Sequence, residues 1–203
     1  TVDVDGDSLP GNKGAPLLFI AARQGHVGLI DLLLQSGADV DQGKPTSGCT
    51  SLYIAAQEGH LSMVMKLIAA GADVNKATTD DGATPLYIAA QEGHLTVVTK
   101  LIAAGADVNE ARSPRTTTGT TPLFIAAQNG HFTVVTKLIA AGADVNKALT
   151  TSGATPLYIA AQNGHLAVVT KLIAAGALVD KARTTDGCTP LYIAAQEGHL
   201  TVV

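Results

Sequence analysis

Apolar and polar positions along the chain follow a pattern that returns about every 34 residues. In one unit, the apolar stretch 85–90 runs into a polar pair and then a glycine. After the glycine, Leu95, Val98, Leu101 and Ile102 fall three or four residues apart, the spacing that places side chains on one side of a helix. Each unit therefore predicts two helices, at 85–92 and about 95–104.

The residues at the ends of these stretches fit the same interpretation. Thr84 precedes Pro85, and a threonine hydroxyl can cap free backbone N–H groups while proline suits the first helical position. Gly93 and Gly105 follow the two apolar stretches, and glycine adopts the left-handed conformation that ends helices. The Asp-, Asn-, Thr- and Gly-rich segment between units predicts an extended turn.

Six copies start at Pro16, Thr50, Thr84, Thr121, Thr155 and Thr189, at intervals of 34, 34, 37, 34 and 34 residues. We interpret residues 1–203 as a single array with repeats at about 15–48, 49–82, 83–119, 120–153, 154–187 and 188–203, the last truncated. Residues 1–14 are interpreted as the remnant of a preceding repeat or finger. Because the end lacks a polar capping repeat, we expect a piece of a longer protein and self-association through the uncapped C-terminal end.

One helix pair cannot bury its apolar face alone, whereas stacked pairs can. The unit resembles the ankyrin repeat, whose signature T-P-L-H-x-A is matched closely by residues 84–89. The resemblance implies an all-α solenoid of stacked antiparallel helix pairs with β-hairpin-like fingers projecting to one side. It also implies binding of another protein through the fingers and the concave face of the first helices.

Composition and charge narrow the classes of partner that the chain could bind. The chain is 46% hydrophobic and 3% aromatic, which suits thin aliphatic layers, and its net charge of -4 argues against nucleic acid and an anionic membrane. No apolar run reaches the ~18 residues of a membrane helix. No nucleotide loop, nucleophile–base pair or catalytic carboxylate pair is present, so we expect no enzyme activity, no cofactor and no small-molecule substrate.

Histidine and cysteine, the residue types that could bind metal, have fixed places in the repeat. All six histidines follow the turn glycine: His26, His60, His94, His131, His165 and His199. Helix pairs stack ~8–10 Å apart, too far for two of them to share a zinc with bonds of ~2.0–2.1 Å. We expect instead a bond to the turn backbone. Cys49 and Cys188 lie four repeats apart, beyond the ~7 Å limit of a disulfide, which predicts free thiols and an intracellular, cytoplasmic protein.

Aromatic residues replace the signature histidine of the repeat at Phe19, Tyr53, Tyr87, Phe124, Tyr158 and Tyr192. They either pack between first helices or form a partly exposed ladder on the concave face. At the ends of the first helices, polar residues are either solvated surface or partner contacts: Gln57, Glu58, Gln91, Glu92, Gln128, Asn129, Gln162 and Asn163. For partner binding we select this set together with Tyr53, Tyr87, Phe124 and Tyr158.

The fingers vary most between repeats. The finger at 110–119 is three residues longer than the others and places Arg112 and Arg115 on a projecting tip. Leu149 sits at another tip, and Leu178 replaces the usual Asp. These four residues complete the predicted contact set. Lys66, Lys100, Lys137 and Lys171 recur on the second helices, where we expect a solvated outer face.

The predicted function is therefore a protein–protein interaction scaffold. Two alternatives stay open: a regulatory or targeting segment of a larger enzyme or channel, and a structural spacer.

Overall fold

The computed structural model describes residues 16–112 and 119–202. The predicted remnant at 1–14 lies outside these residues. Within them, eleven helices follow one another: α1 (Leu17–Gln24), α2 (Val27–Gln35), α3 (Ser51–Gln57), α4 (Leu61–Ala69), α5 (Pro85–Glu92), α6 (Leu95–Ala103), α7 (Pro122–Gln128), α8 (Phe132–Ala140), α9 (Pro156–Gln162), α10 (Leu166–Ala174) and α11 (Pro190–Gln196).

The predicted capping residues set the helix ends. The hydroxyl oxygen of Thr84 accepts a 3.1 Å hydrogen bond from the Tyr87 N–H, and Pro85 is the first residue of α5. Gly93 ends the helix in the left-handed conformation, with φ of 79°. The prediction for α5 is confirmed, and α6 ends one residue earlier than expected, at Ala103.

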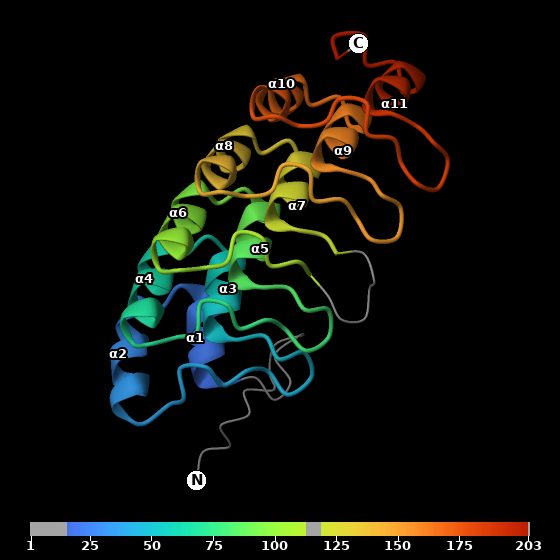
Figure 1. Cartoon of the computed structure of the whole chain (residues 1–203). Coiled ribbons are helices and arrows are strands. Elements are labelled where there is room, and N and C mark those ends of the chain that lie inside the picture. The colour runs from blue at the N-terminus through green and yellow to red at the C-terminus, as the bar shows by residue number, and fades with distance from the viewer. Residues whose placement is uncertain (1–15, 113–118, 203) are drawn as a thin grey trace.

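The helices form two rows. One row contains the first helices of the repeats, which are α1, α3, α5, α7, α9 and α11. The second helices α2, α4, α6, α8 and α10 form a parallel row beside it (Figure 1). Each first helix packs against the next first helix and against its own second helix. The loops between repeats project on the side away from the second helices (Figure 1). The predicted all-α repeat solenoid is confirmed.

The fingers are turns rather than hairpin strands in the part of the chain that the structure describes. Each is closed by one backbone hydrogen bond, such as Thr78 N–H to Ala83 O at 3.0 Å. Neighbouring fingers also bond to one another, since Thr79 N–H donates to Ser47 O at 2.8 Å. The single β-bridge among the described residues joins Arg112 and Thr120 in the long finger.

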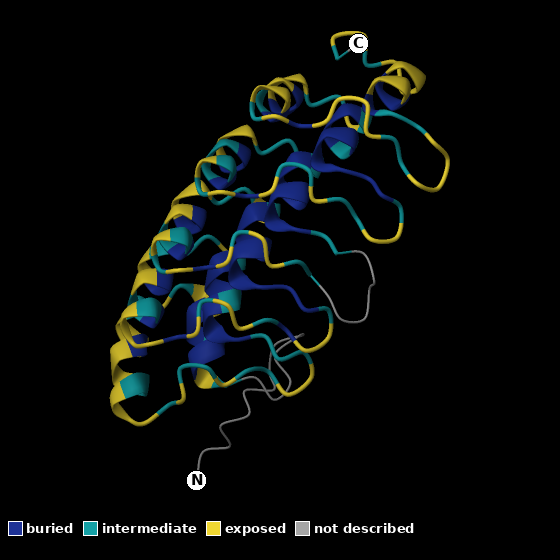
Figure 2. Cartoon of the chain, viewed as in Figure 1, coloured by how far each residue is buried: buried dark blue, intermediate teal, exposed yellow. Residues whose placement is uncertain are grey.

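A continuous core runs between the two rows of helices (Figure 2). In the third repeat it contains Leu86, Ala89, Val97, Val98 and Leu101, all nearly without exposed surface. The alanines of the first helix have little side chain, which allows the neighbouring first helices to approach closely. Each repeat therefore buries its apolar face against its neighbours.

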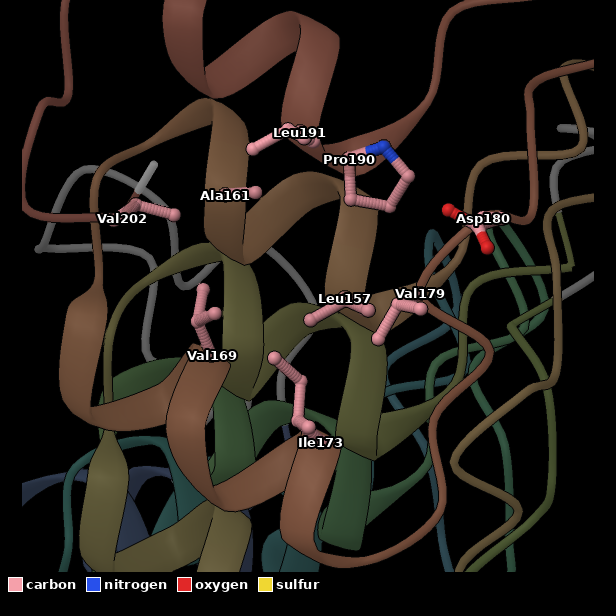
Figure 3. A pocket seen from close by; sticks show the side chains of 9 residues that line it. All are labelled: Leu157, Ala161, Val169, Ile173, Val179, Asp180, Pro190, Leu191 and Val202. Carbon is pink, nitrogen blue, oxygen red and sulfur yellow. The ribbon is translucent and has the colours of Figure 1, made fainter.

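The C-terminal end of the stack is open. Leu191 in α11 is 56% exposed, whereas its equivalent in the third repeat, Leu86, is 1% exposed. A cavity of about 200 Å³ lies here between α9, α10 and α11, with Ile173 and Leu191 in its lining (Figure 3). The truncation predicts poor cover for Leu166, Val169 and Leu172 of the fifth repeat; Leu166 is 45% exposed, whereas Val169 and Leu172 stay buried. The uncovered apolar surface falls on residues nearer the end of the stack.

Candidate functional site

The Gly-His turns connect neighbouring repeats. His94 Nε2 lies 2.9 Å from the backbone oxygen of Gln57 in the preceding repeat. A carbonyl oxygen only accepts, so Nε2 carries the proton and donates. The other pairs are His60 with Arg23, His131 with Gln91, His165 with Gln128 and His199 with Gln162, at 2.9–3.1 Å. The predicted structural role is confirmed, but the acceptor belongs to the preceding repeat rather than to the histidine's own turn.

The turn glycine lies directly against the next histidine. A Cβ atom added at Gly93 would come 2.7 Å from the ring of His131, and Gly93 has a φ of +79°. Only glycine satisfies both the backbone conformation and the close approach. Among the described residues, no group of three potential metal ligands comes together.

An asparagine that sequence analysis missed makes a second connection between repeats. Asn109 accepts a 2.8 Å hydrogen bond from the Asp144 N–H and donates one of 3.3 Å to Gly142 O. Asn75 and Asn146 make the equivalent bonds. Their recurrence at one position of the repeat was visible in the sequence, but the bonding partner was not.

The aromatic residues that replace the signature histidine pack inside the array in the internal repeats, whereas Tyr192 of the terminal α11 is 57% exposed. Tyr87, Phe124 and Tyr158 are only 3%, 4% and 1% exposed, and Tyr53 is half-buried. Burial raises the pKa of the Tyr53 phenol above its ordinary value. Of the two alternatives, these rings pack between the first helices and do not form an exposed aromatic ladder on the concave face.

Cationic side chains cover two of these rings. The guanidinium of Arg112 lies 5.5 Å from the ring centre of Tyr87, and that of Arg183 lies 5.1 Å from Tyr158. Arg112 also pairs with Asp81, and Arg183 donates a 3.1 Å hydrogen bond to the Tyr158 hydroxyl. Arg112 is therefore at the base of its finger and not at the tip.

The other selected finger residues lie in different surroundings. Leu149 is half-buried and packs on the core at the position equivalent to Arg112, so it is not a tip residue either. Leu178 is 53% exposed, and its backbone N–H donates to Asn146 Oδ1 at 2.9 Å. Arg115 lies outside the described residues.

The ends of the first helices form a polar edge, which we call the turn edge. Gln57, Gln91, Gln128 and Gln162 are half-buried, and Glu58, Glu92, Asn129 and Asn163 are exposed. The two asparagine side chains bond to the preceding repeat, Asn129 to Gln91 O at 2.9 Å and Asn163 to Gln128 O at 2.7 Å. Exposed carboxylates occupy this position in the second, third and sixth repeats, at Glu58, Glu92 and Glu197.

Cys49 and Cys188 are both free thiols, as predicted. Burial raises the pKa of Cys49, and the carboxylates of Asp80 and Asp81 act in the same direction, outweighing the hydrogen bond from Ser47. The thiol form is favoured, which makes Cys49 a poor nucleophile.

Stacked helix pairs joined by repeated polar contacts define a helical repeat solenoid. A family model described as ankyrin repeats matches residues 18–112, 75–149 and 123–203. The chain therefore belongs to the ankyrin-repeat family, whose members are generally protein–protein interaction modules and typically non-catalytic. No curated protein matches the chain. Among the described residues, none of the helices is both long enough and apolar enough to span a membrane.

Proposed function

We propose that the chain is a non-catalytic scaffold that binds a protein or peptide along the turn edge and the fingers. The proposal is supported by the positions at which the sequence differs between repeats. The turn histidine, which joins the second to sixth repeats to the repeat before, is the same in all six repeats. In the second to fifth repeats the turn edge has a glutamine followed by a second polar residue. This second residue changes from Glu58 and Glu92 to Asn129 and Asn163, and the fingers differ in length and charge.

The observation that carries the proposal is the exposure of Glu58 and Glu92 at equivalent positions of adjacent repeats. Two carboxylates in register offer charged hydrogen-bond acceptors that repeat stacking does not use. The Glu92 carboxylate is held by the Gln91 amide, which donates to it at 3.0 Å. A partner with basic side chains would fit this part of the edge.

The remaining selected residues take different parts in this proposal. Tyr87, Phe124 and Tyr158 support the finger bases from inside, with Tyr53 half-exposed beside them. Leu178 offers an exposed apolar contact, and Arg115, outside the described residues, is the other arginine selected for a partner. The free thiols agree with a cytoplasmic location, where thiols stay reduced.

The test is a proximity-labelling and pull-down screen with the array as bait, followed by titration calorimetry. Glu58→Gln with Glu92→Gln should weaken binding of the captured partner by at least about tenfold, since each hydrogen bond to a charged group contributes ~1.5–3 kcal/mol and ~1.4 kcal/mol corresponds to a factor of ten. Lys100→Gln with Lys137→Gln, on the opposite side, is the matched control. Capture of another domain of the same gene product would favour the regulatory-segment alternative. A screen without any selective partner would contradict the proposal and favour a spacer.

A further inference from the structure

The second helices α4, α6, α8 and α10 present an exposed side that no other part of the described chain covers (Figures 1 and 2). We call this side the outer face. In α6 it consists of the exposed residues Leu95, Thr96, Thr99 and Ala103 and the half-buried Lys100. These positions span an arc of roughly 140°, because successive helical residues advance by about 100°.

Apolar side chains line one flank of the outer face. Met65, Leu95, Phe132 and Leu166 are 48%, 36%, 44% and 45% exposed. Leu95, Phe132 and Leu166 occupy the same position in three consecutive repeats and form a row, and Met65 lies one helical turn further along its helix, at the position of Thr99. Contiguous exposed apolar surface marks an interaction site more often than isolated exposed residues do.

Lysines line the other flank, at Lys66, Lys100, Lys137 and Lys171. None of the four helices contains Asp or Glu. Lys66 pairs with Asp31 of α2, and the other three form no ion pair with any described residue. Apart from Asp31, the acidic side chains of the described residues form no ion pair with these lysines, so the net charge of -4 does not describe this face.

We propose that the outer face docks on an anionic lipid surface. Exposed apolar residues beside lysines are the composition of protein segments that lie in the membrane interface, and each lysine near such a surface contributes ~1 kcal/mol. Lysine stems can lie along the apolar flank while their ammonium groups reach the lipid phosphates. The net charge of -4 led to the expectation that the protein does not bind an anionic membrane. The proposal differs from that expectation because net charge is an average over all faces of the molecule.

Two other occupants fit less well. A second copy of this chain placed face to face would oppose lysine to lysine, which is unfavourable. A particular protein partner needs differences to recognise, and α6, α8 and α10 repeat nearly one sequence: LTVVTKLIA, FTVVTKLIA and LAVVTKLIA. A laterally uniform surface such as a bilayer requires no such differences.

The experiment is co-sedimentation with vesicles of equimolar phosphatidylserine and phosphatidylcholine, compared with phosphatidylcholine alone. The wild-type chain should bind the anionic vesicles, bind the neutral ones poorly, and be released by high salt. Lys100→Glu, Lys137→Glu and Lys171→Glu combined should lower binding by at least about tenfold. The matched control makes the same charge change at the exposed finger lysines Lys76, Lys147 and Lys181 and should stay within about twofold of wild type.

A second variant tests the apolar flank. Leu95→Ser with Phe132→Ser should lower vesicle binding while thermal unfolding stays cooperative, because both side chains are already partly in water. No binding of the wild type to anionic vesicles at low salt overturns the proposal. So does equal loss in the finger-lysine control. Binding of soluble polyglutamate but not of vesicles through the same lysines would assign the face to an acidic protein segment instead.

Discussion

The imidazole of His131 donates a 2.9 Å hydrogen bond to the backbone oxygen of Gln91, 40 residues earlier. In the other repeats the same bond spans 37 residues, as in His94 to Gln57. The difference is the three-residue insertion in the long finger, which lies between the two partners. The insertion therefore changes the finger without altering the contact that joins the repeats.

His94→Ala should lower the free energy of unfolding by about 1–2 kcal/mol, because the Gln57 carbonyl loses its donor. Chemical denaturation measures the change. His26→Ala is the matched control, since His26 occupies the same turn in the first repeat, is exposed, and its ring forms no hydrogen bond with a described residue. Equal effects of the two variants would contradict the proposed role, and so would zinc bound in proportion to protein and lost with His94.

Gly93→Ala and Gly105→Ala separate backbone strain from steric conflict. Both glycines have positive φ, 79° and 90°, but a Cβ at Gly105 meets nothing within 4 Å. Gly105→Ala should cost about 1–2 kcal/mol for the left-handed backbone alone. Gly93→Ala should cost a further ~1–3 kcal/mol, because the His131 ring must move and give up its bond. Similar unfolding free energies for the two variants would contradict the close packing seen here.

Asp81 should make the stability of the array depend on pH. Partial burial raises the pKa of its carboxyl. Hydrogen bonds from the Thr78 hydroxyl and the Ala83 N–H, together with the charge of Arg112, lower this pKa by more than burial raises it, so the net effect is a lowered pKa. The stabilisation is therefore present above the unfolded pKa near ~3.9 and is lost as pH falls through the lower folded value.

The measurement for Asp81 is denaturation of the wild type and Asp81→Asn between about pH 6 and pH 2.5. The gap between the two proteins should narrow as the solution becomes acidic. Asp80→Asn serves as control, since Asp80 is exposed and forms no ion pair with a described residue. A gap that stays constant with pH would show that the Asp81 charge does not stabilise the fold.

The two arginines of the long finger should separate binding from folding. Arg115→Ala should weaken an acidic or phosphorylated partner by about 1–3 kcal/mol without changing the unfolding free energy. Arg112→Leu, which copies the residue found at position 149, should cost stability of ~1 kcal/mol through the lost contacts with Tyr87 and Asp81. Titration calorimetry of both variants measures their affinity for the partner, and denaturation measures their unfolding free energy. Unchanged affinity for Arg115→Ala would place the partner elsewhere.

Much of the fold followed from the sequence because each local signal had one structural solution. Thr84, Pro85 and Gly93 set the bounds of α5, and the apolar spacing defined α6. Contacts between repeats were harder to predict. Since every repeat carries the same residues, the sequence could not show that His94 reaches backwards to Gln57. Likewise, the finger sequence of Arg112 suggested a tip, and only the fold shows Tyr87 and Asp81 holding it at the base.

The open end of the stack should exchange its amide hydrogens quickly. In α11, Tyr192 is 57% exposed, whereas its equivalent Tyr87 in α5 is 3% exposed. Few buried contacts mean a low local opening free energy, so amides of α11 should exchange faster than those of α5. Equal protection in a strictly monomeric sample would contradict this. Slower exchange at higher protein concentration would instead indicate self-association through the uncapped end.

The asparagine and histidine contacts between repeats have a consequence for how such a gene can change. Because Asn75, Asn109 and Asn146 each make the same join, the second, third and fourth repeats offer the same bonding partner to the repeat that follows them, whereas Asp41 takes this position in the first repeat. Copying or losing a 34-residue unit by recombination would leave every remaining junction intact. The length of the array can therefore vary between descendants far more freely than any single junction residue can.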